Sequence, residues 1–208
     1  MTLPPHLAPT VRVPQQERSR QGWERVLEVG LQLLEDGGAE AVTITEVCRR
    51  ARVSPPSLYA RVDGRAGLFA AVYERGMTAV RATEQAVFEA RPAFGAPPEA
   101  RAADAAAGLA EVFRRHHRFL RPVIALAAAD PDLLRRGGTE SQRLLGLVAA
   151  ALPLPPDQAG EVARTLYAEC ILRTMYGPAF LTPEPETDAG FKQRLGRLAA
   201  RMCAFDVA

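Results

Sequence analysis

The side chains of this chain that could do chemistry are few, and they form no recognisable catalytic group. The three cysteines, Cys48, Cys170 and Cys203, are far apart and do not follow the spacing of metal ligands. Neighbouring residues on a helix point about 100° apart, so His116 and His117 cannot easily share one ion. The sequence has no nucleophile beside a base, no glycine-rich phosphate loop and no HExxH. We therefore expect binding rather than catalysis, with no metal and no cofactor.

Positive charge is concentrated in two segments of the chain. The formal net charge of the whole protein is only +2, whereas residues 43–65 contain five arginines against two acidic residues. Residues 1–22 contain three arginines against one glutamate. Arginine clusters bind the phosphates of nucleic acids, although a charged segment is more often simply a solvated face. The charge pattern alone therefore gives only weak support for DNA binding.

Two hydroxyl residues could each begin a short helix in the basic segment 43–65. Thr43 is followed three residues later by Glu46, which is the pattern of a capping box. Ser54 is followed by two prolines, Pro55 and Pro56, which a first helical turn tolerates. An amphipathic helix precedes them and ends at two glycines, at 37–38. Three helices, with a tight turn between the second and the third, predict a helix-turn-helix.

The residues from Trp23 to Val72 closely resemble the DNA-binding domain of the tetracycline-repressor (TetR) family. The shared features are the amphipathic first helix, the glycine loop, the sequence V-S-x-x-S-L-Y at 53–59, and Arg65 shortly before Leu68. The resemblance implies a short recognition helix, and a long helix from near Arg65 that joins two domains. It also implies a C-terminal domain that dimerises and binds an effector.

The resemblance also implies which residues contact double-stranded operator DNA. They are Thr43, Ser54, Pro55, Ser57, Tyr59, Ala60, Arg61 and Arg65. Hydroxyls and helix N-terminal amides bind phosphates, and contacts to base edges determine sequence preference. Capping alone would also explain Thr43 and Ser54, packing would explain Tyr59, and solvation would explain Arg65. We assign Trp23 and Leu58 to the core.

Several positions depart from the family pattern. Arg52 stands in the turn where the family commonly has glycine, and a positive φ there would cost roughly 1 kcal/mol or more. Pro55 and Pro56 remove two backbone donors from the recognition helix, and Ala60 is small and apolar. Base readout would then rest on a few side chains, such as Ser57 and Arg61.

Proline and glycine divide the rest of the chain, which shows helical patterns and no convincing strand. Beyond the helix that begins near Arg65, the expected helices cover 99–117, 118–129, 139–152, 157–177 and 189–204. We predict an all-α protein, with a helix-turn-helix domain followed by a helical bundle. The predicted units are a disordered arm at 1–16, the DNA-binding domain at 17–65, and an effector-binding and dimerisation domain at 66–208. No apolar run is long enough to span a membrane, and the N-terminus lacks the apolar core of a signal peptide, so we expect a cytoplasmic protein.

Two sets of residues are candidates for the sensing half, and each residue of the first set, the candidate pocket, is more often part of a core. The candidate pocket residues are Phe88, Phe113, His117, Leu126, Leu145, Leu172, Met175, Tyr176 and Phe180. The candidate dimer residues are Val162, Leu166, Tyr167, Cys170, Thr174, Phe191, Leu195, Leu198, Ala199 and Met202. We expect the latter to pair across a two-fold axis as a four-helix bundle.

The sequence thus predicts a homodimeric regulator, a repressor that a small and largely apolar ligand releases from a pseudo-palindromic operator. Two alternatives remain open at this point. The chain could be a helical small-molecule-binding protein whose N-terminal unit no longer reads DNA, or it could be an activator.

Overall fold

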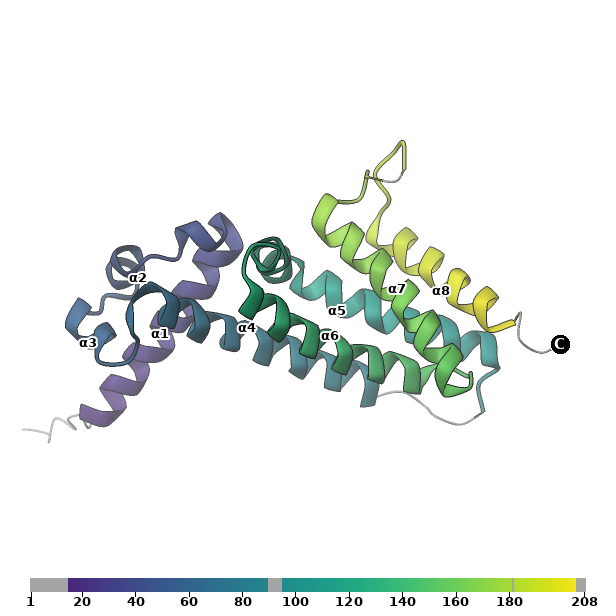
Figure 1. Cartoon of the computed structure of the whole chain (residues 1–208), viewed down its shortest axis with the longest axis horizontal. Helices are drawn as coiled ribbons and strands as arrows, with labels where there is room; N and C mark the ends of the chain where they lie inside the picture. Colours follow the sequence, from purple (N-terminus) through teal and green to yellow (C-terminus); the bar gives the residue numbers. More distant parts are fainter. Residues whose placement is uncertain (1–14, 90–94, 181, 205–208) are drawn as a thin grey trace, which may run out of the picture.

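The computed structural model of the chain describes residues 15–89, 95–180 and 182–204. Within these ranges all regular structure is helical, which confirms the predicted all-α class (Figure 1). The elements are α1 (Gln15–Gly37), the 3-10 helix η1 (Ala39–Ala41), α2 (Ile44–Ala51), α3 (Pro55–Tyr59), α4 (Gly64–Glu89), α5 (Pro98–Ala127), α6 (Pro131–Ala151), α7 (Pro156–Tyr176) and α8 (Asp188–Ala204). Most of the predicted arm, residues 1–14, lies outside the described residues. Positions 15 and 16 belong to α1, so the helix begins earlier than predicted.

The first three α-helices form a small head, whose buried side chains are continuous with the core of the bundle. The apolar stripe of α1 supplies Val26 and Leu34, and α2 supplies Val47. Leu58 is buried, as the sequence predicted, and Val62, which follows α3, is also buried. The short helix α3 therefore fixes one side chain in the core and leaves its other face outside.

Helix α4 continues from the head into the C-terminal bundle without a linker. The predicted domain boundary at residue 65 falls in its first turn, so the two domains share this helix. On one side, Val72 packs so closely against Gly30 of α1 that a Cβ atom added at Gly30 would overlap the Val72 side chain. On the other side, the ring of Phe119 from α5 lies directly on Gly76. These close contacts join α4 to both domains.

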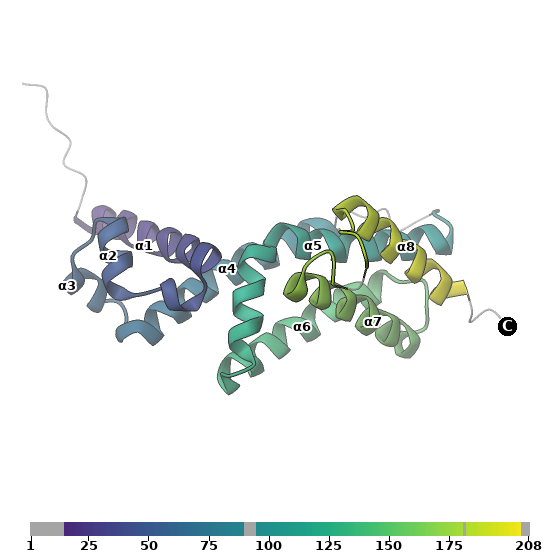
Figure 2. The ribbon, with the colours of Figure 1, turned by 90° about the horizontal axis from the view of Figure 1, so that it is seen from above.

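Helix α5 is one helix, and the prediction of separate helices at 99–117 and 118–129 was wrong. The helix does bend sharply along its length, and its last part runs toward α6 (Figure 2). Pro122 lies inside the helix and has no N–H to donate to the carbonyl of Arg118, which is a common cause of such bends. The sequence thus placed a break where the structure has a bend.

Helix α6 begins at Pro131, eight residues before the predicted start at 139. The side chain of Asp130 caps it by accepting hydrogen bonds from the backbone N–H groups of Asp132 and Leu133, both at 3.0 Å. Gly137 and Gly138 lie inside the helix, just before the predicted start. This strong N-cap and the proline in the first turn outweigh the low helix propensity of two glycines.

The predicted dimer stripes of α7 and α8 face the inside of the chain, and most of that expectation needs correction. Six of the ten residues are buried in a single copy: Val162, Leu166, Cys170, Phe191, Leu195 and Ala199. They pack with α5, which runs beside both helices (Figure 1). The apolar pattern marked helices with one buried face, and it did not show that their partner is α5 of the same chain.

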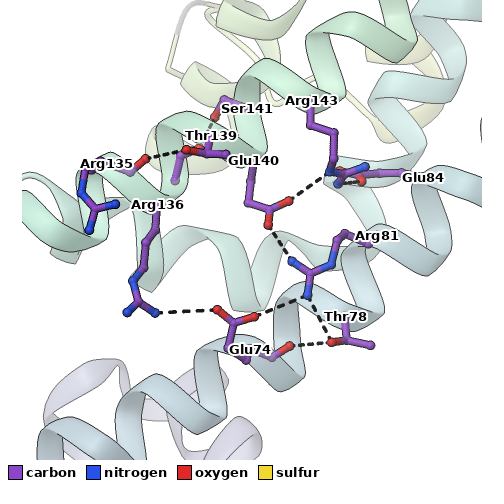
Figure 3. A network of polar contacts seen from close by, with 11 residues as sticks. Glu74, Thr78, Arg81, Glu84, Arg135, Arg136, Thr139, Glu140, Ser141 and Arg143 are labelled. Atoms are coloured by element: carbon purple, nitrogen blue, oxygen red, sulfur yellow. Dashed lines mark hydrogen bonds and ion pairs between the residues drawn. The ribbon is translucent and has the colours of Figure 1, made fainter.

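An ionic network links α4 to α6 beside this core (Figure 3). It comprises Glu74, Arg81 and Glu84 of α4 with Arg136, Glu140 and Arg143 of α6. Arg81 binds Glu140 at 2.6 Å, and Arg143 binds both Glu140 and Glu84. Glu84 is only 2% exposed, so Arg143 compensates a carboxylate that is removed from water. The network therefore fixes the position of α6 along α4.

None of the helices in the described part of the chain is long and apolar enough to cross a membrane.

The contact at Gly76 predicts that Gly76→Ala lowers the free energy of unfolding by about 1–2 kcal/mol. The added methyl must displace the Phe119 ring, and this overpacking outweighs the gain in helix propensity. Gly146→Ala in α6 is the control, because nothing lies within 4 Å of the added Cβ. It should stabilise the protein by about 0.5–1 kcal/mol. Urea denaturation measures both, and equal effects would contradict the close contact.

The buried carboxylate predicts that Arg143→Met destabilises the protein by about 2–3 kcal/mol, because Glu84 would lose its cation. This is less than for a fully buried pair, since Arg143 itself is partly exposed. Glu84→Gln added to Arg143→Met should restore part of the loss. Arg135→Met breaks the exposed pair with Asp132 and should change stability by less than about 0.5 kcal/mol. A similar loss from both single variants in urea denaturation would refute this account.

Candidate functional site

The turn between α2 and α3 has the geometry that the sequence suggested. Arg52 has φ 55° and ψ 47°, and it is the only described non-glycine residue with a positive φ. Its backbone N–H donates to the carbonyl of Cys48, and the N–H of Val53 donates to the same oxygen at 3.2 Å. An arginine in the left-handed region costs about 1 kcal/mol. The tight turn between the two helices outweighs this strain.

Thr43 caps α2, but the predicted capping box forms only in part. The Oγ1 atom of Thr43 accepts a hydrogen bond from the N–H of Glu46 at 3.2 Å. The carboxylate of Glu46 does not return to the N–H of Thr43, which instead donates to the carbonyl of Ala41. Arg49 and Arg50 bind this carboxylate, and their hydrogen bonds lower the pKa of Glu46 to about 2. Glu46 therefore stays ionised and partly neutralises these two arginines.

The outer face of α3 carries small polar and apolar groups. Ser54 caps the helix by accepting from the N–H of Ser57 at 3.4 Å, and the two hydroxyl oxygens lie 2.8 Å apart. Pro55 and Ala60 are exposed, and Tyr59 is 56% exposed. The helix lies at the end of the molecule farthest from α8 (Figure 1). This face is therefore open to a large partner.

Arg61 and Arg65 are held by the head itself. The guanidinium of Arg61 donates to the Oγ atom of Ser19 on α1 at 2.8 Å and lies 5.3 Å from the ring centroid of Trp23. Arg65 donates to the carbonyl of Ala39 at 2.8 Å and to that of Val42, and it pairs with Glu40. Both arginines fasten the head together. Arg61 would have to leave α1 before it could read a base.

All eight predicted DNA-contact residues lie in or beside α2 and α3, or at the start of α4, so the fold brings them to one end of the molecule. Trp23, which the sequence assigned to the core, is half-buried and packs against it beneath Arg61.

The nine predicted pocket residues do not share one cavity. Phe113, His117 and Tyr176 line a cavity of about 350 Å³ between α5, α7 and α8, which we call the α5–α7–α8 cavity. Leu126 lines a second cavity beside η1 and α4, and Phe88 lines a third beside α6. Leu172 and Phe180 line a small hollow at the α7–α8 connection, whereas Leu145 packs against the core. Met175 is half-buried and belongs to none of these cavities.

Charged residues of the α5–α7–α8 cavity were missed by the sequence reasoning. The cavity is lined by Arg114, Arg121, Arg173 and Lys192, together with Glu111 and Asp188. On α5 the signal was present, because positions 114, 117 and 121 follow a helical spacing and share a face. The contributions of α7 and α8 depended on the tertiary arrangement.

The two histidines point to different places, as expected for neighbours on a helix. The Nε2 atom of His116 lies 2.8 Å from the Oγ1 atom of Thr83 on α4. Burial, with a smaller effect of Arg115, lowers the pKa of His116. His117 lines the α5–α7–α8 cavity. Over residues 15–89, 95–180 and 182–204, no group of three or more His, Cys, Asp or Glu side chains could hold a metal ion.

Comparison with known folds agrees with this geometry. A transcriptional regulator described as TetR-like, from Rhodococcus sp. RHA1, has a TM-score of 0.63 and 18% identity, over 93% of this chain and 99% of its own. A protein from Streptomyces coelicolor, described as a candidate transcriptional regulator, has the same TM-score and identity, over 86% of this chain and 98% of its own. These likenesses show a shared fold. No curated protein matches the chain.

The head also matches by sequence. Residues 26–72 match the sequence model of the family described as bacterial regulatory proteins, tetR family. This range runs from α1 through the helix-turn-helix to the first turns of α4. By sequence, this part of the chain is thus similar to the DNA-binding domain of the tetR family of bacterial regulatory proteins.

Proposed function

We propose that the protein is a homodimeric repressor that a small molecule releases from a pseudo-palindromic operator. The observation that best supports this proposal is the exposed face of α3 at the free end of the head. Each copy would place this helix in one major groove, and the two grooves would lie about one helical turn apart. Binding alone accounts for this role, so we propose no catalysis. The DNA partner places the protein in the cytoplasm.

Most contacts of this face would go to the DNA backbone. Tyr59, Thr43 and Ser54 offer hydroxyl donors to phosphates, whereas the two prolines at the start of α3 leave it without free backbone donors there. Pro55 and Ala60 can make apolar contacts with thymine methyl groups. The only hydroxyl on α3 itself besides that of Tyr59 belongs to Ser57, so we propose that few hydrogen bonds read bases. Hydroxyl and apolar contacts carry no charge, so such an interface would depend less on salt than one built on arginines.

Helix α4 provides the route from an effector to the head, because it belongs to both domains. A ligand that prefers one arrangement of the bundle would shift α4, and with it the spacing of the two recognition helices. Coupling between two such sites is usually about 1–3 kcal/mol. We propose the α5–α7–α8 cavity as the effector site, because three of the predicted pocket residues meet there.

The dimer would use the outer faces of α7 and α8, since their inner faces are buried against α5. Ala168 is exposed on the outside of α7, and Leu172 beyond it is half-buried. On α8, Leu198 and Met202 of the predicted stripe also keep part of their surface. Two copies joined here would form a four-helix bundle with a revised set of contacts.

The DNA interface predicts that Tyr59→Ala weakens binding to a specific fragment about tenfold, because an exposed phosphate contact is lost. The fragment comes from a binding selection on genomic DNA that includes the region upstream of the gene. Gel shifts at several salt concentrations measure the affinity, and the slope of the salt dependence should stay the same, because Tyr59 carries no charge. Arg135→Ala, at an exposed arginine of α6, is the control and should bind as the parent does.

A selection that yields no specific fragment would overturn this function and favour a ligand-binding protein that no longer reads DNA. Transcription in vitro from the selected promoter then tests the sign of regulation. Repression supports the proposal, whereas stimulation would identify an activator.

The dimer face predicts that Ala168→Arg shifts the protein from dimer to monomer. The substitution is at an exposed position, so the fold should survive, but two buried cations would face each other across the axis. Leu134→Arg is the control, because Leu134 is a 60% exposed apolar residue on α6. Light scattering after gel filtration measures the mass. A dimer that survives Ala168→Arg would place the interface elsewhere.

A further inference from the structure

The α5–α7–α8 cavity carries an excess of positive charge. Four of its lining residues are cations, and only two are acids. The two acids are already paired, because Glu111 binds Arg114 at 2.8 Å and Asp188 binds Arg173 at 2.8 Å. Hydrogen bonds from Arg114 and Arg115 hold the pKa of Glu111 at about 2, although burial opposes them, so this carboxylate stays ionised. The acids therefore do not compensate the remaining cations.

Arg121 and Lys192 are the remaining cations. In the described structure, neither makes a hydrogen bond or an ion pair. Arg121 comes from the bent part of α5, and Lys192 comes from the first turns of α8, so two separate helices bring positive charge to one cavity. Charges of one sign that line a hollow concentrate the opposite charge there. This arrangement favours an anion.

Most of the other residues in the cavity wall are apolar. Phe113 and Phe191 are almost fully buried, and each exposes an edge to the cavity together with Ala110. The guanidinium of Arg173 lies 4.7 Å from the ring centroid of Phe191, so apolar and cationic walls adjoin. The volume of about 350 Å³ suits a small organic molecule rather than an inorganic ion.

We propose that this cavity binds an amphipathic organic anion, such as an aryl or alkyl carboxylate. Arg121 and Lys192 hold the acid group, and Phe113 and Phe191 contact the apolar body. This inference rests on the proposed effector site and names the class of its ligand.

The bent part of α5 links the cavity to the head, so the effect of a bound anion can pass directly to the head. His117 and Arg121 line the cavity, whereas their neighbours Arg118 and Phe119 face the other way. Arg118 pairs with Asp36 of α1, and Phe119 lies on Gly76 of α4. An anion that draws Arg121 inward therefore moves the same helical segment that contacts both α1 and α4.

The test is calorimetric titration of the full chain with 1-naphthoate and decanoate, each compared with its neutral alcohol, 1-naphthalenemethanol or decanol. At least one carboxylate should bind ten times more tightly than its alcohol. The variant Arg121→Gln/Lys192→Gln should remove this preference while still binding the alcohol. The matched control Arg135→Gln/Arg164→Gln removes two exposed cations outside the cavity and should keep the preference.

The inference is overturned if neither carboxylate binds better than its alcohol, or if both double variants behave alike. Gel shifts on the selected DNA fragment, with and without the bound carboxylate, separate this result from the proposed function. Carboxylate binding without any DNA binding would refute the repressor and leave the cavity assignment standing. DNA binding without a preference for carboxylates would refute the cavity assignment and leave the proposed repressor standing.

Discussion

The close packing of α4 against two partners is the constraint on which the rest of the structure depends. Val72 packs on Gly30 of α1, and Phe119 of α5 packs on Gly76, so the helix touches both domains at positions that accept no side chain. A packed core has discrete arrangements rather than continuous ones, so α1 and α5 cannot move independently of α4. The head and the bundle thus share one rigid element, and a change in either domain reaches the other.

Charged contacts around α4 supplement this packing. The ionic network fixes α6 along one side of the helix, and the buried Glu84 makes that register costly to change (Figure 3). At the bend of α5, the ion pair between Arg118 and Asp36 joins the bundle to α1. The cavity lined by the unpaired cations Arg121 and Lys192 adjoins the same bend, which contains Pro122. A ligand there would act where the helix is easiest to deform.

Some residues of the head hold its helices together, and others are exposed on its outer face. Arg61 and Arg65 look like phosphate or base contacts in the sequence, yet their guanidinium groups bind Ser19, Ala39 and Val42 of the head. The exposed face of α3 is left with hydroxyls and small apolar groups. In the proposed complex, such a surface would contact mainly the DNA backbone, and indirect effects of DNA shape would then contribute to specificity.

The sequence by itself determined the all-α class, the helix-turn-helix, the caps at Thr43 and Ser54, and the strained turn at Arg52, because these depend on residues within a few positions of one another. The bend of α5 and the early start of α6 also have local causes, Pro122 and the cap at Asp130, which the sequence-based prediction did not weigh correctly. The partner of the α7–α8 stripes was decided by the tertiary structure. An apolar stripe such as Val162, Leu166 and Cys170 shows that a helix buries one face, but not against what. The same holds for the cavity, since the cations of α5 and α8 are far apart in the chain and only the folding of α8 onto α5 brings them together.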